Sequence, residues 1–158
     1  MRIDSAETEA SQRPRLLICE DAPIERAGLA YLLRLRGYDV CESADGDTAI
    51  QSLTEGKFDL LLLDLSLPGI DGFDVLRFVQ KQKPETRVIL LSGTSPEKIQ
   101  ERLTDLPGHV LPPLLLKPVD PEQVYDLVEM QLSGQLDNLN CQTPAESENK
   151  TGDQFSHN

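Results

Sequence analysis

Five polar side chains of chemically useful types stand at the ends of short apolar runs. Glu20 and Asp21 follow RLLIC, Asp64 follows four leucines, Ser92 ends RVILLS, and Lys117 follows three leucines. In an open parallel sheet the carboxyl ends of the strands border one crevice, where residues far apart in sequence can meet. The pattern therefore predicts that these five side chains converge at one edge of a sheet.

The chemistry of this set is specific. Three carboxylates repel one another unless a cation joins them, and carboxylate oxygens together with water suit Mg²⁺. A lysine can bind an anionic oxygen, and the Ser92 hydroxyl can donate a hydrogen bond. Metal, ammonium and hydroxyl together suit phosphoryl transfer, which depends mostly on positioning and charge neutralisation. Asp64 is the predicted nucleophile, forming an aspartyl phosphate.

The apolar runs must form the strands that position these residues. They alternate with amphipathic segments, which is typical of βαβ units and predicts an α/β fold with a parallel sheet covered on both faces. The predicted strands are Arg15–Glu20, Tyr38–Glu42, Phe58–Asp64, Arg87–Ser92 and Leu114–Lys117.

Helix starts are marked by capping residues and proline. A first helix is predicted near Pro23–Arg36, where Ile24, Ala27, Tyr31 and Leu35 give one apolar face. Further helices are expected to begin at Ser95-Pro96 and at Asp120-Pro121, where Gln123 completes a capping box. Asp45-Gly46 and Asp71-Gly72 are turn or helix-start signals. In the last helix, Val124, Leu127 and Val128 should pack on the sheet.

Composition and charge exclude several classes of function. The formal net charge is −12 and no basic cluster occurs, which argues against binding nucleic acid. Cys19, Cys41 and Cys141 lack metal-ligand spacing, and we interpret them as reduced thiols. No apolar stretch is long enough to span a membrane, so a cytoplasmic protein is expected. We expect residues 1–13 and 133–158 to be disordered segments flanking one domain at residues 14–132.

The segment from Arg15 to about Leu132 resembles the receiver domain of two-component response regulators. The resemblance rests on LLICEDAP, LLLLDLSLPGIDGFDVL, VILLSG and LLLKP, which match in order and spacing. It implies the flavodoxin-like, doubly wound five-stranded sheet of order 2-1-3-4-5. We expect a single-domain receiver, because only a polar tail follows the last helix in the sequence.

The resemblance also assigns roles to the residues at the strand ends. Asp64 would accept phosphate from a partner's phosphohistidine. Mg²⁺ would be held by Asp21 directly, by Glu20 through water, by Asp64, and by the backbone carbonyl of Ser66. Ser92 would be the switch hydroxyl. Lys117 would be the cation beside the phosphoryl group, with a cis bond to Pro118.

Two features depart from the family pattern. Leu114 occupies a place where the family often has an aromatic residue that changes rotamer with the switch hydroxyl. The segment LPGHVLPPLLLKP has more residues before Lys117 than usual, and Pro112-Pro113 should stiffen it. The sequence therefore predicts an unusual approach to the last strand and puts the aromatic switch in doubt.

The leading hypothesis is a phosphoacceptor signalling module rather than an enzyme. Its expected partners are a histidine kinase or histidine phosphotransfer protein and a downstream protein, with no nucleic acid and no membrane. The fourth or fifth helix would be a surface for docking or homodimer formation. A second hypothesis is a receiver-derived scaffold that binds a partner regardless of phosphorylation. A third hypothesis is a phosphatase of the haloacid-dehalogenase kind. Such an enzyme uses a second Asp as general acid two residues after the nucleophile, and this sequence has Ser66 there.

Overall fold

The computed structural model describes residues 13–104 and 111–134. The segments predicted to be disordered lie outside the described residues, apart from Arg13, Ser133 and Gly134. No helix in the described part of the chain is long and apolar enough to cross a membrane.

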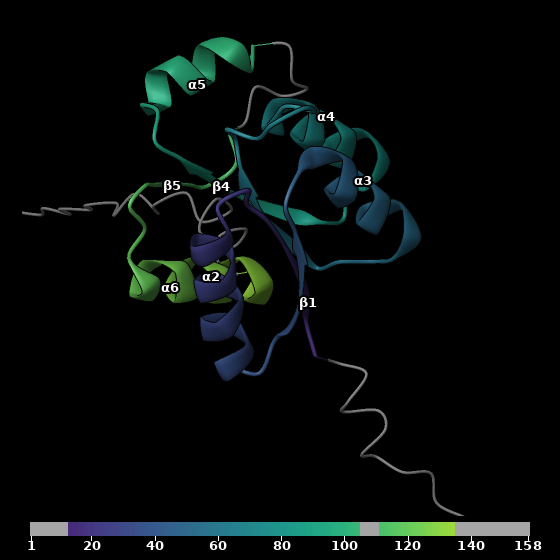
Figure 1. The fold of residues 1–158 in the computed structure, drawn as a ribbon, viewed down its shortest axis with the longest axis vertical. Coiled ribbons are helices and arrows are strands. Elements are labelled where there is room, and N and C mark those ends of the chain that lie inside the picture. Colours follow the sequence, from purple (N-terminus) through teal and green to yellow (C-terminus); the bar gives the residue numbers. More distant parts are fainter. Residues whose placement is uncertain (1–12, 105–110, 135–158) are drawn as a thin grey trace, which may run out of the picture.

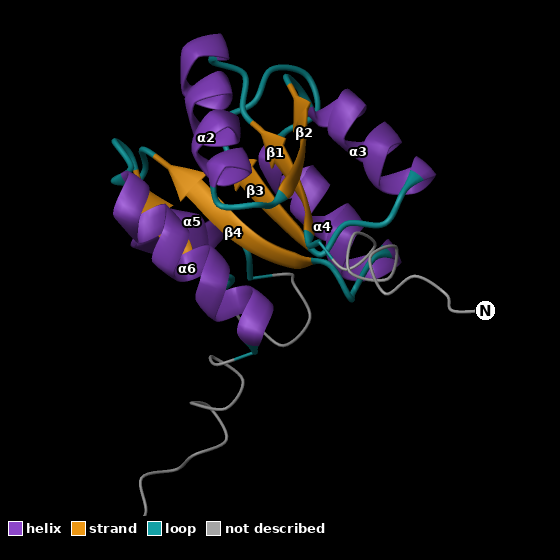
Figure 2. Ribbon diagram, turned by 90° about the horizontal axis from the view of Figure 1, so that it is seen from below, coloured by secondary structure: helices purple, strands orange, loops and turns teal. Residues whose placement is uncertain are grey.

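Five parallel strands form one sheet in the order β2-β1-β3-β4-β5, as predicted. The strands are β1 (Arg15–Cys19), β2 (Asp39–Ser43), β3 (Leu60–Asp64), β4 (Arg87–Ser92) and β5 (Leu114–Leu116). The helices are α2 (Pro23–Leu35), α3 (Gly46–Glu55), α4 (Gly72–Gln82), α5 (Pro96–Arg102) and α6 (Pro121–Ser133). Figures 1 and 2 show the sheet between two helical layers, with α2 and α6 on one face and α3 and α4 on the other.

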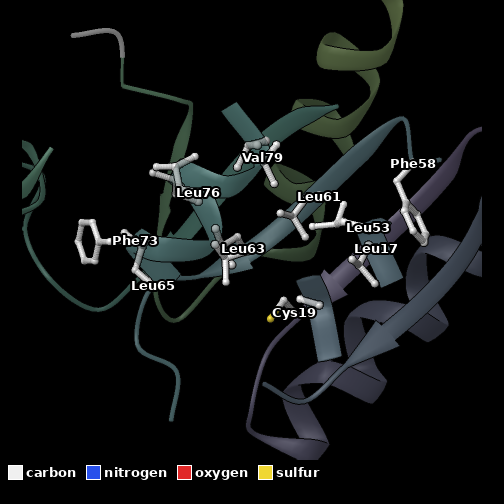
Figure 3. Close-up of a cluster of buried hydrophobic side chains, with 14 of the residues drawn as sticks. Leu17, Cys19, Leu53, Phe58, Leu61, Leu63, Leu65, Phe73, Leu76 and Val79 are labelled. Atoms are coloured by element: carbon white, nitrogen blue, oxygen red, sulfur yellow. The ribbon is translucent and has the colours of Figure 1, made fainter. Parts of the chain in front are cut away.

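The central strand β3 is buried on both faces. Leu61 and Leu63 pack with the side chains of α3 and α4, while Leu60 and Leu62 pack with those of α2 and α6. Figure 3 shows the first of these clusters. All four leucines are fully buried, and each contributes about 1.5–3 kcal/mol by leaving water. The leucine run therefore fixes β3 in the core and brings Asp64 to the edge of the sheet.

The prediction for the apolar face of α2 was wrong, because the structure exposes that face to solvent and packs another face on the sheet. Ile24, Tyr31 and Leu35 are 87%, 63% and 64% exposed, whereas Leu29 and Leu33 are buried against the sheet. Both sets have helical spacing, so periodicity alone does not say which face packs. The buried face has the denser group of apolar residues, and the outer face keeps its side chains in solvent.

Aspartate side chains begin three of the helices. This confirms the predicted start at Asp120 and shows that Asp45 and Asp71, which the sequence left open as turn or helix-start signals, begin helices. Asp45, Asp71 and Asp120 accept hydrogen bonds from the backbone N–H groups of Thr48, Phe73 and Glu122. Each thereby satisfies an N–H group that has no partner inside its helix. α5 begins after Ser95, as predicted, although the Ser95 side chain makes no capping hydrogen bond. In α6, Val124 and Val128 pack on the sheet, with Leu127 partly buried beside them.

The last strand is short and follows the two prolines directly. The carbonyl of Pro113 accepts a hydrogen bond from the Leu90 N–H at 2.8 Å, so pairing with β4 begins just before Leu114. Of the segment predicted to alter this approach, residues 106–118, residues 106–110 lie outside the described residues. Leu114 itself is half-buried against the core.

Candidate functional site

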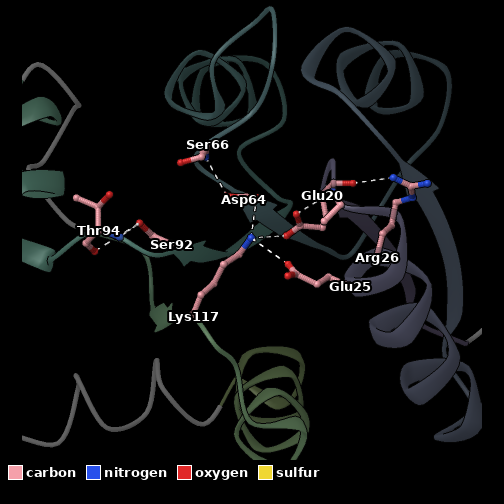
Figure 4. A network of polar contacts seen from close by, with 9 residues as sticks. Glu20, Glu25, Arg26, Asp64, Ser66, Ser92, Thr94 and Lys117 are labelled. Atoms are coloured by element: carbon pink, nitrogen blue, oxygen red, sulfur yellow. Dashed lines mark hydrogen bonds and ion pairs between the residues drawn. The ribbon is translucent and has the colours of Figure 1, made fainter.

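The carboxyl ends of the strands bring the predicted residues to one edge of the sheet. Asp64 and Ser92 are the last residues of β3 and β4, while Glu20 and Lys117 directly follow β1 and β5. Figure 4 shows Lys117 extended toward Asp64 and Glu20. The peptide bond between Lys117 and Pro118 is cis, as the resemblance implied.

The Asp64 carboxylate is held by two donors. Its Oδ1 atom accepts a hydrogen bond from the Ser66 backbone N–H at 2.9 Å, and its Oδ2 atom lies 2.8 Å from Lys117 Nζ. The residue is only 2% exposed. Charge-assisted hydrogen bonds of this length fix the orientation of a carboxylate strongly.

Glu20 and Asp21 bring two more carboxylates to Asp64. Glu20 is 1% exposed, and its two oxygens accept from the Ala22 N–H at 3.1 Å and from Lys117 Nζ at 2.7 Å. Asp21 is exposed. One oxygen of each of these three residues lies within 4.8 Å of the others. Three hard oxygen donors, one of them facing solvent, fit the preference of Mg²⁺ for carboxylates and water.

Burial and ion pairing work against each other in the electrostatics of this site. Burial raises the pKa of Glu20 to about 7, although the hydrogen bonds from Lys117 and Ala22 act in the opposite direction. Burial would lower the pKa of Lys117, but its ion pairs with Asp64 and Glu20 outweigh that effect and raise it. Lys117 is therefore a fixed positive charge between two carboxylates.

Ser92 lies at this edge but is directed to its own loop. Its buried hydroxyl accepts a hydrogen bond from the Thr94 N–H at 2.9 Å and approaches the Thr94 carbonyl at 3.4 Å. Figure 4 shows this pair apart from the contacts around Lys117. The structure thus places Ser92 beside the site without joining it to Asp64. Of Ser66, only the backbone N–H takes part in the contacts described above.

The start of α4 packs very closely on the end of β3. Gly72 is buried, and a Cβ atom added there would lie 2.5 Å from the Asp64 carbonyl oxygen and 2.6 Å from the Leu65 Cα. A side chain at this position requires the backbone beside Asp64 to shift. Glycine at residue 72 therefore lets the helix approach the carboxylate-bearing strand end.

Sequence reasoning missed Glu25, which lies in the first turn of α2. Its Oε2 atom lies 3.4 Å from Lys117 Nζ. Glu25 and Lys117 also line a cavity of about 240 Å³, whose apolar wall includes Leu29, Leu91 and Val119. The signal available in the sequence was an acid five residues after Glu20, on a helix that begins at the same edge of the sheet.

Comparison with known proteins identifies relatives over most of the described chain. The family model of the response regulator receiver domain matches residues 16–129. The transcriptional regulatory protein TcrA of Mycobacterium tuberculosis is 34% identical over 111 residues, which cover 70% of this chain and 43% of TcrA. This chain therefore spans less than half the length of that curated relative.

Solved structures show the same fold. A CheY-like response regulator receiver domain protein from Methanospirillum hungatei JF-1 superposes with a TM-score of 0.72 at 21% identity, covering 80% of this chain and 99% of its own. The response regulator protein TrrA of Thermotoga maritima, solved in complex with Mg²⁺-BeF, has a TM-score of 0.65 at 27% identity. That match covers 75% of this chain and 99% of TrrA.

Proposed function

The chain belongs to the response regulator receiver domain family, and from that premise we propose that it is a phosphoacceptor module of a two-component phosphorelay. The proposal rests on one observation above all. Asp64 ends the central strand with its carboxylate held by Ser66 and Lys117, beside the carboxylates of Glu20 and Asp21. The proposed receiver spans residues 14–132, with the remaining residues flanking it.

The proposed reaction transfers a phosphoryl group from a phosphohistidine to Asp64. A carboxylate oxygen of Asp64 forms the new O–P bond while the P–N bond breaks, and the bonding electron pair stays on the imidazole nitrogen. Glu20, Asp21 and Asp64, with the Ser66 carbonyl, would hold Mg²⁺, which when bound would offset negative charge on the phosphoryl oxygens. TrrA, solved with Mg²⁺-BeF, supports this assignment.

Lys117 and Ser92 have supporting roles in the proposal. Lys117 pairs with Asp64 before transfer and, as a long flexible cation, would turn to an oxygen of the new phosphoryl group. Ser92 would exchange its hydrogen bond with Thr94 for one to that group. The exchange would carry the change at Asp64 into the loop that leads to α5.

Intact-protein mass after incubation with acetyl phosphate tests the proposal. We expect a single phosphoryl adduct that requires Mg²⁺, is lost in Asp64→Asn, and persists in Asp126→Asn, which alters an exposed carboxylate on α6. An equal adduct on wild type and Asp64→Asn would reject Asp64 as the acceptor.

Separate experiments test the proposed partners. Phosphoryl transfer tests the histidine kinase or phosphotransfer protein, and pull-down tests the downstream protein that docks at α5 or α6. Self-association through these helices is tested by sedimentation.

A receiver-derived scaffold that works without phosphorylation is the second candidate. It is favoured by Leu114, a half-buried aliphatic residue that cannot act as an aromatic switch. Hydrogen exchange of α5 with and without Mg²⁺ and beryllofluoride separates the two. A change in α5 supports a working switch, and identical exchange supports the scaffold.

A further inference from the structure

Lys117 is shared by three carboxylates, one of which the phosphoryl chemistry does not require. Its Nζ atom lies 2.7 Å from Glu20, 2.8 Å from Asp64 and 3.4 Å from Glu25. Figure 4 shows these three contacts radiating from the ammonium group. Glu25 comes from α2 rather than from a strand end, and its side chain is 59% exposed.

Charge accounting singles out Glu25. The carboxylates of Glu20, Asp21 and Asp64 form the oxygen cluster, and Glu25 is not part of it. The charges of three carboxylates, one divalent cation and the Lys117 ammonium group sum to zero, so this set is electrically neutral before a phosphodonor arrives. The Glu25 carboxylate then adds one negative charge in excess.

The neighbouring basic residue does not offset this charge. Arg26 donates to the Glu20 carbonyl at 2.9 Å and pairs with Glu42 at 3.5 Å. Figure 4 shows the Arg26 guanidinium directed away from Lys117 and Glu25.

The surroundings of Glu25 strengthen its field. The cavity that it lines with Lys117 has an apolar wall that includes Leu29, Leu91 and Pro118. Apolar groups beside a charge lower the effective dielectric constant, so the charge acts more strongly than in open water. An anionic group approaching Lys117 meets the negative charge of Glu25.

We propose that Glu25 selects the phosphodonor by charge. It disfavours a free, doubly anionic donor more strongly than one that carries a positive charge next to its phosphoryl group. This inference rests on the proposed function. With acetyl phosphate, Asp64 forms an O–P bond and the bonding pair leaves with acetate. With phosphoramidate, the P–N bond breaks and the pair leaves with ammonia.

The test compares the two donors on wild type and Glu25→Gln near neutral pH, where acetyl phosphate is a dianion and phosphoramidate carries an ammonium group. For unit charges roughly 6 Å apart in a partly aqueous site, we expect phosphorylation by acetyl phosphate to accelerate about three- to tenfold. Phosphorylation by phosphoramidate should accelerate by at most about two- to threefold. This acceleration should always be smaller than the one measured with acetyl phosphate. High salt should narrow the difference between wild type and variant.

Two further variants separate charge from other causes. Glu85→Gln removes the same charge in the turn before β4, at the opposite edge of the sheet, and should change neither rate. Glu25→Lys reverses the charge and should enlarge the preference for acetyl phosphate beyond that of Glu25→Gln. Equal changes with both donors, or unchanged rates in Glu25→Gln, would overturn the inference while leaving Asp64 as the acceptor. Absence of any adduct with either donor on every variant would remove the proposed function and this inference with it.

Discussion

Replacing Gly72 by alanine should destabilise the protein because no room exists for a Cβ atom. Such an atom would lie 2.5 Å from the Asp64 carbonyl oxygen and 2.6 Å from the Leu65 Cα. Both are backbone atoms of the segment that leaves the central strand, so neither can rotate away. Overpacking of this kind costs about 1–3 kcal/mol, and the strand end would have to move away from α4.

Gly28→Ala is the matched control, since it makes the same chemical change in another helix. A Cβ atom there meets nothing within 4 Å. Alanine favours the helix and restricts the unfolded chain, so this variant should be more stable than wild type by about 0.5–1 kcal/mol. The two variants are thus expected to change stability in opposite directions.

Urea unfolding measures both effects. We expect a lower midpoint for Gly72→Ala and a higher one for Gly28→Ala, with similar m-values, because neither substitution changes the surface exposed on unfolding much. The phosphorylation rate of Gly72→Ala should also fall, since the shift is next to Asp64. If Gly72→Ala is as stable as wild type, the close approach of α4 to β3 described above is incorrect.

Three further predictions concern the core, a buried thiol and a buried acid. Leu62→Ala should lower the free energy of unfolding by about 2–5 kcal/mol. Leu116→Ala, at a residue that is 51% exposed, should lower it by under about 1 kcal/mol. Similar losses for the two variants in urea unfolding would contradict the packing of β3. Burial, followed by nearby carboxylates, raises the pKa of the Cys19 thiol to about 12. Alkylation of the native protein, followed by peptide mapping, should therefore label half-buried Cys41 much faster than Cys19. Equal labelling of the two thiols would contradict this prediction. The pKa of Glu20 is raised from 4.5 to about 7, so the metal-free folded state favours its protonated form, and stability should fall as the pH rises from about 4.5 to about 7. In Glu20→Gln this decline should be reduced, and an unchanged pH profile of unfolding in chelator would refute the assignment.

Much of the site could be predicted because strand direction imposes a simple rule. Parallel strands end at the same edge, so the residues after each apolar run had to meet there once the runs were identified as strands. The structure places Glu20, Asp64 and Lys117 at this edge, where Lys117 contacts both carboxylates. The aspartates that begin helices were also predictable, since a capping side chain bonds to N–H groups only two or three residues away.

The sequence by itself therefore determined the order of the elements, the burial of β3 and the edge at which the polar residues gather, because these depend on local pattern and strand direction. Only the tertiary structure decided which face of α2 packs on the sheet, since Leu29 with Leu33 and Ile24 with Tyr31 both satisfy helical spacing. It also decided that Glu25 reaches Lys117, 92 residues away in sequence. Both depend on how a helix is rotated and placed against the sheet, and that is set by packing between elements rather than by the pattern within one of them.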